Sequence, residues 1–526
     1  MPAIAAPFTS TRATGAMVAS ADQLATQAGM SILAQGGNAV DAAIATNAAI
    51  AVTGPHMCGM GGDLYALIHD GTQVHALNST GRAGSGSDAA RLRSEGHTEM
   101  PFRHDIRIVT VPGCVDGWCA LHERFGRLPL AQLLAPAIRL AEDGFPASPL
   151  LIGAFALLDD QARESLHEVV EQARRPGDRV RRPGAARALR AIAENGRDGL
   201  YLGEFGEGLR RIGGGLYSEA DLATPGATWV APLSQDAFGR RLHTIPPNSQ
   251  GYLLLGSAAL ADRLPLPADP DDPQWAHLLV EAAKAAGYDR PVVLHENADG
   301  PALLATIAQR LGSIDPTAAS RRVPPTFDGD TTYLCTVDHD RMGVSLIQSN
   351  ASNFGSWLVE PNTQINLHNR GLGFSLQHGH PGELAPGRRP PHTLSPALAT
   401  NPDGSLAAVF GTMGGDGQPQ ILLQVATRLF HHGLSPAAAL HAGRWILKGP
   451  VTGFDTWTAP AGPQVLIEGH APAEWRAALT ERGHTVVVSP PYDSAFGHAH
   501  AIVVEPDGML SGAADPRTRI GSVAGL

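Results

Sequence analysis

The chain has 526 residues, of which 43% are hydrophobic and 17% charged, and its formal net charge is −11 at pH 7. This composition supports a large buried core, and length alone is compatible with several domains. The 60 glycines and 41 prolines are spread through apolar, periodic segments, which indicates many tight turns rather than disorder. No basic run of the kind that follows a phosphate backbone occurs, so the sequence argues against nucleic-acid binding.

The cysteine pattern gives no sign of a disulfide framework or a zinc site. None of the four cysteines forms a CxxC pair, and no cluster of His and Cys has zinc-ligand spacing. We therefore expect buried thiols and neither a metal nor a cofactor. Residues 1–20 lack a charged region followed by an apolar one, and no uninterrupted apolar run reaches membrane-spanning length. These features predict a soluble, cytoplasmic protein that does not bind a membrane.

In chain order, residues 21–53 predict two helices separated by Gly36-Gly37, with Asn38 as the N-cap of the second. The second helix is apolar on most faces, which is typical of a buried helix. The glycine-rich stretch 54–63 allows close approach of backbone to backbone or to a ligand. It lacks the Lys-Ser/Thr ending of a phosphate loop, so it does not predict a nucleotide site.

Two strands, 64–69 and 74–77, are predicted around the turn Asp70-Gly71, and residues 108–112 predict a further strand. Arg82 follows the strand predicted at 74–77. An arginine in this position is usually a surface charge, but its guanidinium could also bind a substrate carboxylate bidentately.

Helical periodicity dominates the middle of the chain. Residues 150–225 are polar and rich in arginine, which is most simply a solvated helical face. The predicted helices outside that region span residues 115–125, 130–143, 252–261 and 275–287, and another begins near residue 300.

The stretch 329–338 is rich in β-branched and aromatic residues and follows the turn residues Gly329 and Asp330, so it predicts a strand. One interpretation is an ordinary strand after a turn. The other is that the peptide bond before Thr331 is cut, so that Thr331 begins a new chain with its hydroxyl as nucleophile and its α-amine as base. These residues alone leave both interpretations open.

Strands become more frequent beyond Thr331. Residues 332–338 and 343–348 predict a hairpin, and a long loop is expected from 369 to 391. Further strands are predicted at 365–368, 406–410, 485–489 and 499–505, with one helix at 420–430. Helices first and strands later favour an α+β fold with sheets layered between helices.

Short motifs are spread in order over nearly the whole chain. They are Gly36-Gly37-Asn38-Ala39-Val40-Asp41-Ala42-Ala43, Gly59-Met60-Gly61-Gly62, Val111-Pro112-Gly113, Leu140-Ala141-Glu142-Asp143-Gly144-Phe145, Pro246-Pro247-Asn248-Ser249-Gln250-Gly251, Asp330-Thr331-Thr332, Met413-Gly414-Gly415 and Asp515-Pro516-Arg517. Each is weak alone, but their common order is specific, and it resembles that of the γ-glutamyltransferase family of N-terminal-nucleophile hydrolases.

The resemblance implies a four-layer αββα sandwich and a precursor that cuts itself between Asp330 and Thr331. Residues 1–330 would form the large subunit and residues 331–526 the small subunit, together making one fold. Thr331, rather than Thr332, matches the family's nucleophile. The resemblance also implies a hydrolase or acyltransferase that acts on γ-glutamyl amides such as glutathione, as a zymogen that needs no cofactor. A homo-oligomer is among the partners left open.

The resemblance assigns further site residues. Gly414 and Gly415 match the oxyanion hole, although such a pair can also be a simple turn. Ser349 matches the hydroxyl that supports the nucleophile, although a polar loop serine is the commoner meaning. Arg82 matches the family's carboxylate-binding arginine.

The sequence also departs from the family in the substrate pocket. Gly373 stands where the family has the aspartate that binds the glutamyl α-amine, and Arg370 replaces a neighbouring acidic or amide residue. His392-Thr393 replaces a serine pair that binds the α-carboxylate, and Ala351 replaces an asparagine that Asn350 or Asn353 could substitute. Residues 374–390 are shorter than the loop covering the site in many members, which resembles a hydrolysis-leaning branch.

Three functions follow. The first is cleavage of γ-glutamyl amides through an acyl-enzyme on Thr331. The second keeps this mechanism but acts on another acid amide, such as oxamate or a glutaryl amide, because exchanging a carboxylate for the Arg370 guanidinium makes the pocket more positive. The third is an unprocessed scaffold without catalysis.

Overall fold

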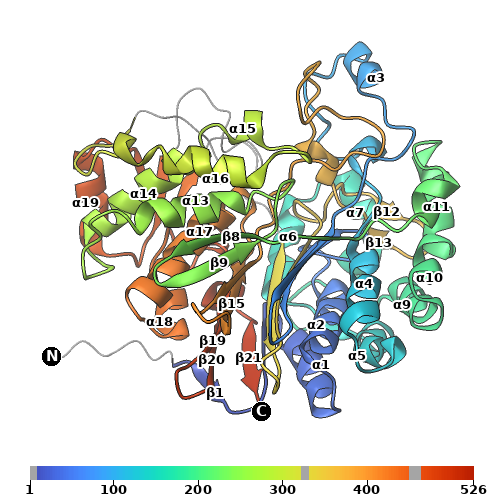
Figure 1. The fold of residues 1–526 in the computed structure, drawn as a ribbon. Coiled ribbons are helices and arrows are strands. Elements are labelled where there is room, and N and C mark those ends of the chain that lie inside the picture. Colours follow the sequence, from blue (N-terminus) through green and yellow to red (C-terminus); the bar gives the residue numbers. More distant parts are fainter. Residues whose placement is uncertain (1–8, 321–330, 449–463) are drawn as a thin grey trace.

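Two seven-stranded antiparallel sheets stack face to face, and helices cover the outer face of each, in the computed structural model that describes residues 9–320, 331–448 and 464–526 (Figure 1). This is the predicted α+β architecture, a four-layer αββα sandwich. No described helix is long and apolar enough to cross a membrane.

Sheet I contains the strand that begins immediately after Thr331. Its order is β21 (Ser522–Gly525), β2 (Met17–Ser20), β10 (Thr332–Val337), β11 (Gly343–Ser349), β3 (Asp63–His69), β4 (Val74–Ser79) and β7 (Thr228–Val230). Sheet II has the order β1 (Thr11–Ala13), β20 (Leu510–Ala514), β19 (Ala499–Val504), β15 (Leu406–Thr412), β14 (Ala397–Thr400), β9 (Arg240–Thr244) and β8 (Leu233–Ala237). Each sheet therefore combines strands from both sides of residue 331.

A buried apolar layer joins the two sheets. It includes Tyr65, Tyr333, Ile347, Val409 and Ile502, all of which are fully buried. Because successive side chains of a strand point to opposite faces, these residues represent only the inward half of each strand.

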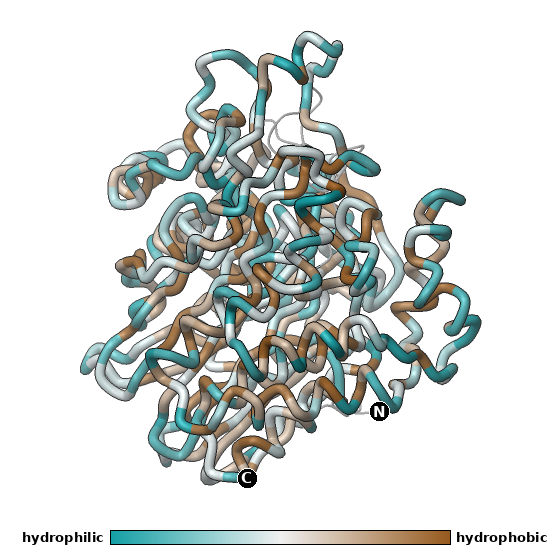
Figure 2. Tube along the Cα trace, turned by 90° about the vertical axis from the view of Figure 1, so that its right-hand side faces the viewer, coloured by the Kyte–Doolittle hydropathy of each residue, from teal (hydrophilic) through white to brown (hydrophobic). Residues whose placement is uncertain are grey.

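The outer face of sheet I packs against a helical layer that includes α1 (Gln23–Ala34), α2 (Ala39–Thr53), α4 (Cys114–Phe125), α5 (Leu130–Asp143) and α9 (Pro183–Asn195). Every residue of α2 is buried, in line with the predicted buried helix, and Asn38 caps it through a capping box with Asp41. Sheet II is covered by α13 (Tyr252–Ala261), α14 (Pro273–Gly287), α17 (Gln418–Ala426), α18 (Pro436–His441) and α19 (Ala473–Glu481). Figure 2 shows hydrophobic residues concentrated towards the interior and hydrophilic ones on outer turns and helices.

The remaining elements are short. The helices are α3 (Ala89–Ser94), α6 (Pro149–Ala154), α7 (Asp160–Ser165), α8 (His167–Val170), α10 (Arg197–Tyr201), α11 (Glu204–Gly213), α12 (Glu219–Ala223), α15 (Arg290–Val293) and α16 (Gly300–Ala308). The strands are β5 (Phe145–Pro146), β6 (Arg179–Val180), β12 (Val359–Glu360), β13 (Ile365–Asn366), β16 (Trp445–Lys448), β17 (Gln464–Glu468) and β18 (Val486–Ser489).

The long periodic segments agree with the sequence-based prediction, but two predicted strands differ and several short strands were not predicted. The strand predicted at 108–112 is wrong: a 3-10 turn at Ile106–Ile108 is followed by extended chain outside both sheets. The strand predicted at 365–368 shrinks to two residues, and the approach to Thr331 at 321–330 lies outside the described residues. Short strands such as β2, β9 and β21 were not predicted, because a strand of four or five residues carries too little periodic signal.

The cysteines are free, and three of the four are buried, as the sequence predicts; Cys119 is half-buried. Burial raises the pKa of the Cys119 thiol to about 12, so this group is protonated at neutral pH. Among the described residues, no group of three or more His, Cys, Asp or Glu side chains is arranged to hold a metal ion.

We predict that the fold loses stability between pH 7 and 5. Burial lowers the pKa of His56 and His498 to about 3 and that of His392 and His500 to about 4. Below about pH 6.5 the unfolded chain therefore binds more protons than the folded chain. Each such histidine lowers the free energy of unfolding by up to about 1.4 kcal/mol per pH unit in this window.

Thermal denaturation at a series of pH values measures this effect. His500→Gln should make the fall in Tm with acid shallower, whereas His378→Gln should leave it unchanged, because the His378 side chain is 90% exposed. A Tm that stays constant between pH 7 and 5 would contradict the prediction.

Candidate active site

Two predicted site residues, Thr331 and Ser349, lie at one end of sheet I, and a third, Arg82, follows a strand that ends there. Thr331 directly precedes β10, and Ser349 ends β11, the neighbouring strand. Ser349 pairs with Asp63, which begins β3, and the next strand, β4, ends at Ser79, three residues before Arg82. Antiparallel pairing thus brings these starts and ends to the same edge.

The same end of the molecule receives the predicted residues of sheet II. A Cβ on Gly411 of β15 would lie 2.1 Å from the Tyr333 ring, so β15 crosses β10 in close contact there. Gly343, at the far end of sheet I, instead contacts Leu406, at the start of β15. Strands β10 and β15 therefore run in opposite directions, and Gly414 and Gly415, just past the end of β15, lie at the Thr331 end.

Thr331 and Ser349 form a direct hydroxyl pair. Their Oγ atoms are 3.0 Å apart, and both residues are buried. The backbone N–H of Ala351 donates to Ser349 Oγ at 2.7 Å, which fixes the position of that hydroxyl. The family resemblance predicts that Ser349 supports the nucleophile, and the structure brings the two hydroxyls together.

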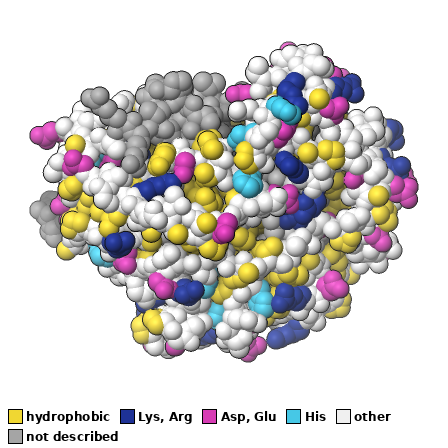
Figure 3. Space-filling model, turned by 45° about the horizontal axis from the view of Figure 1, so that its top comes forward, with side chains coloured by type: hydrophobic (Ala, Val, Ile, Leu, Met, Phe, Trp, Pro, Cys, Tyr) yellow, Lys and Arg dark blue, Asp and Glu magenta, His cyan; other side chains and the backbone are white. Residues whose placement is uncertain are grey.

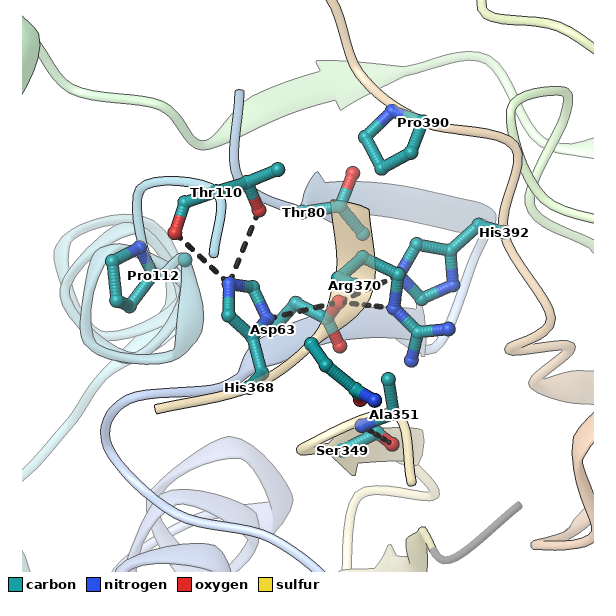
Figure 4. Close-up of polar contacts among 12 residues, drawn as sticks. Asp63, Thr80, Thr110, Pro112, Ser349, Ala351, His368, Arg370, Pro390 and His392 are labelled. Carbon is teal, nitrogen blue, oxygen red and sulfur yellow. Dashed lines mark hydrogen bonds and ion pairs between the residues drawn. The ribbon is translucent and has the colours of Figure 1, made fainter. Parts of the chain in front are cut away.

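Asp63 organises the cluster next to this pair (Figure 4). Its Oδ2 accepts hydrogen bonds from Arg370 Nε at 2.7 Å and from His392 Nε2 at 2.8 Å, and His368 Nδ1 lies 3.6 Å away. Arg370 Nη1 also donates to Thr393 Oγ1 at 3.1 Å. Three predicted substrate-binding residues, Arg370, His392 and Thr393, therefore meet around one carboxylate that sequence analysis did not single out.

The charges of this cluster nearly cancel. Burial alone would raise the pKa of Asp63, but the Arg370 guanidinium and the His392 ring hold it well below its usual range. Burial, with the nearby Arg370, lowers the pKa of His392 to about 4, so this ring is neutral at pH 7. His392 Nδ1 accepts from Leu394 N while Nε2 donates to Asp63. The sequence predicts that Arg370 makes the pocket more positive, but Asp63 offsets its charge.

Gly414 and Gly415 both adopt positive φ, 131° and 52°. Side chains are disfavoured in this conformation, which explains glycine at both positions. Gln250 Nε2 bridges the carbonyl oxygens of Gly415 and Thr393 at 3.0 and 2.7 Å, so the glycine turn is tied to the Asp63 cluster. Among the described residues, neither glycine N–H donates a hydrogen bond.

Among the described residues, the hydrogen-bond partners of Arg82 lie outside the Asp63 cluster. Its Nη1 donates to Glu296 Oε1 at 2.6 Å and to Gly387 O at 2.9 Å, and 41% of its side chain is exposed. Glu296 Oε2 in turn accepts from the backbone N–H of Arg389. A substrate carboxylate would therefore have to share Arg82 with Glu296.

Gly373 has no room for a side chain. A Cβ there would lie 2.3 Å from the carbonyl oxygen of Pro391, and that contact is with backbone.

Two asparagines could substitute for the one that Ala351 replaces. Asn350 uses its Nδ2 to donate to Pro55 O at 3.2 Å. Asn353 faces a neighbouring cavity.

Sequence reasoning missed Asp63, His368 and Gln250. Asp63 ends the glycine-rich stretch and Gln250 belongs to the motif 246–251, so position in a motif was the available signal. Nothing in the local sequence identifies the partner of either residue.

Around this end of the molecule, Lys and Arg side chains are interspersed with Asp and Glu on the face shown in Figure 3.

Comparison with known proteins agrees with this architecture. The family model for gamma-glutamyltranspeptidase matches residues 25–525. The oxamate amidohydrolase proenzyme of Klebsiella pneumoniae is 36% identical, over 97% of this chain and 98% of its own. The glutathione hydrolase-like YwrD proenzyme of Bacillus subtilis is 34% identical, over 95% and 97%. The crystal structure of a cephalosporin acylase from Bacillus halodurans superimposes with a TM-score of 0.89 at 35% identity, covering 100% of this chain and 98% of that one.

We predict that Ser349→Ala lowers kcat about 10- to 100-fold, because it removes one hydrogen bond to the Thr331 hydroxyl. Ser349→Thr, which keeps the hydroxyl, should restore most of the rate. Single-turnover acylation, measured on equal concentrations of the wild type and the two variants, tests this. A wild-type kcat in Ser349→Ala would contradict it.

Proposed function

Because the chain belongs to the gamma-glutamyltranspeptidase family, we propose that it is a proenzyme that cuts itself before Thr331 and then hydrolyses amides through an ester on Thr331. The large subunit would comprise residues 1–330 and the small subunit residues 331–526. The observation that carries the proposal is the buried contact between Thr331 Oγ1 and Ser349 Oγ. This contact lies at the end of sheet I where the other predicted site residues are found.

In self-cleavage, the Thr331 hydroxyl attacks the carbonyl carbon of Asp330, and the C–N bond between the two residues breaks. Water then hydrolyses the resulting ester, which leaves a carboxylate on Asp330 and a free α-amine on Thr331. Ser349 would support both stages, because its hydroxyl lies within hydrogen-bond distance of the attacking oxygen.

In amide hydrolysis, the freed α-amine accepts the proton of the Thr331 hydroxyl as the hydroxyl attacks the substrate carbonyl. The N–H groups of Gly414 and Gly415 would stabilise the negative oxygen of the tetrahedral intermediate. The amine then passes the proton to the leaving nitrogen, and water releases the acid from the ester. Transfer to another amine instead of water is the minor route.

For the acyl group we favour an acid amide without an α-ammonium group over a γ-glutamyl amide. No carboxylate can stand at position 373, and the Asp63 carboxylate is already shared by Arg370 and His392. An acyl carboxylate would find Arg370, Thr393 and Arg82 as cationic or hydrogen-bonding partners. The similarity to an oxamate amidohydrolase proenzyme supports this choice.

We predict that the purified wild-type protein consists of two fragments and that Thr331→Ala remains a single inactive chain. Thr332→Ala serves as the matched control, since Thr332 is the adjacent buried threonine of β10 and should allow cleavage. Intact mass and N-terminal sequencing measure the result. An active wild type that consists only of the full-length polypeptide would overturn the proposal.

The choice of acyl group is tested with γ-glutamyl, oxamic and glutaryl amides. We expect kcat/KM for the acid amides that lack an α-ammonium to exceed that for the γ-glutamyl amide. Gly373→Asp should fail to raise γ-glutamyl hydrolysis, because its Cβ would meet the Pro391 carbonyl. A strong wild-type preference for the γ-glutamyl amide would show that another group replaces the missing aspartate.

A further inference from the structure

A cavity of about 370 Å³ opens beside the glycine turn, and none of the substrate-binding residues discussed above lines it. Gly414 and Met413 form one wall, and Asn353, from the loop that follows Ser349, forms another. The two loops that flank Thr331 therefore also flank this cavity. Leu150, Leu157 and Met57 add apolar side chains to the lining, and Asp493 and Arg519 add one acidic and one basic side chain.

Three residues that line the cavity carry buried polar atoms that have no hydrogen-bond partner among the described residues. Both ring nitrogens of His56, Nδ1 of His498 and Oδ1 of Asn353 make no hydrogen bond. These side chains are only 4%, 2% and 9% exposed. Buried polar atoms normally have a partner, so their accumulation in one cavity indicates a place for a ligand with hydrogen-bonding groups.

The position of the cavity relative to the glycine turn decides which part of a substrate it would take. Gln250 ties Gly415 to Thr393, and Thr393 contacts Arg370, so the acyl-binding candidates lie on that side of the turn. The cavity lies on the side of Gly414, Met413 and Asn353. With the nucleophile and the oxyanion fixed, the two remaining substituents of a tetrahedral carbon, acyl chain and amine, extend in different directions.

We propose that this cavity, called here the amine pocket, binds the amine portion of the substrate and selects amines larger than ammonia that combine an apolar part with an uncharged polar group. The proposal rests on the proposed amidohydrolase function and adds the leaving-group class to it. A volume of about 370 Å³ far exceeds the roughly 30 Å³ of one water molecule, which is close in size to ammonia. The histidines are neutral, because burial lowers the pKa of each to about 3. They therefore suit an uncharged polar group, and the two charged residues of the lining, Asp493 and Arg519, are of opposite sign.

Gly153 of α6 offers a direct test. It lines the amine pocket, and a Cβ there would meet nothing within 4 Å, so Gly153→Leu occupies pocket space without a backbone clash. Gly312→Leu is the matched control, because Gly312 also has open space around its Cβ but lies outside the pocket lining. His56→Phe removes both ring nitrogens and keeps an aromatic ring of similar size.

The measurement compares the p-nitroanilide with the primary amide of one acyl group, the one hydrolysed fastest by wild type. We expect the ratio of their kcat/KM values to fall about tenfold or more in Gly153→Leu and His56→Phe, and to stay constant in Gly312→Leu. An unchanged ratio in both pocket variants overturns the amine pocket while leaving the proposed function intact.

A separate titration keeps the two proposals distinguishable. p-Nitroaniline alone is added to wild type and Gly153→Leu, and binding is followed by NMR line broadening of the ligand. Binding to wild type that is lost in Gly153→Leu supports the amine pocket even if no amide is hydrolysed. Equal behaviour of the two proteins counts against it, whereas an uncut, inactive wild type counts only against the proposed function.

Discussion

The contact between Gly411 and Tyr333 sets the geometry on which the site depends. A Cβ at position 411 would stand 2.1 Å from the Tyr333 ring, so only glycine lets β15 cross β10 at this depth. Tyr333 lies two residues after Thr331, and Gly411 lies three residues before Gly414. Since the strands run in opposite directions, this one close approach brings the nucleophile candidate and the glycine turn to the same edge.

A buried ionic network holds the other side of the glycine turn. Arg444 pairs with Asp515 at 2.7 Å, and Arg517 pairs with both Glu468 and Asp515. Arg444 also donates to the carbonyl oxygen of Phe496, while Asp515 accepts from Ala499 N. The loop between those two residues includes Gly497, whose Cα lies 3.7 Å from where a Cβ of Gly414 would be. Breaking a buried pair leaves an uncompensated charge, so the network fixes this loop firmly.

The sequence predicts the long elements and the identity of several site residues, but not how they are connected. Helix α2 and the hairpin β10–β11 have strong local patterns and agree closely with prediction. Strands β2 and β21, which complete sheet I beside β10, are four residues each and lack such a pattern. The role of Asp63 depends on Arg370 and His392, more than 300 positions away, and only tertiary structure reveals that pairing.

Interleaving of strands explains how a cut before Thr331 is compatible with one stable fold. β10, the first strand after Thr331, is hydrogen-bonded to β2 on one side and to β11 on the other, and β11 pairs with β3. In sheet II, β14 lies between β9 and β15 in the same way. Because both sheets contain hydrogen-bonded neighbours from the two parts, cleavage would break one covalent bond and none of these ladders. The two subunits would then separate only by unfolding, which keeps a newly formed chain end in a preorganised site.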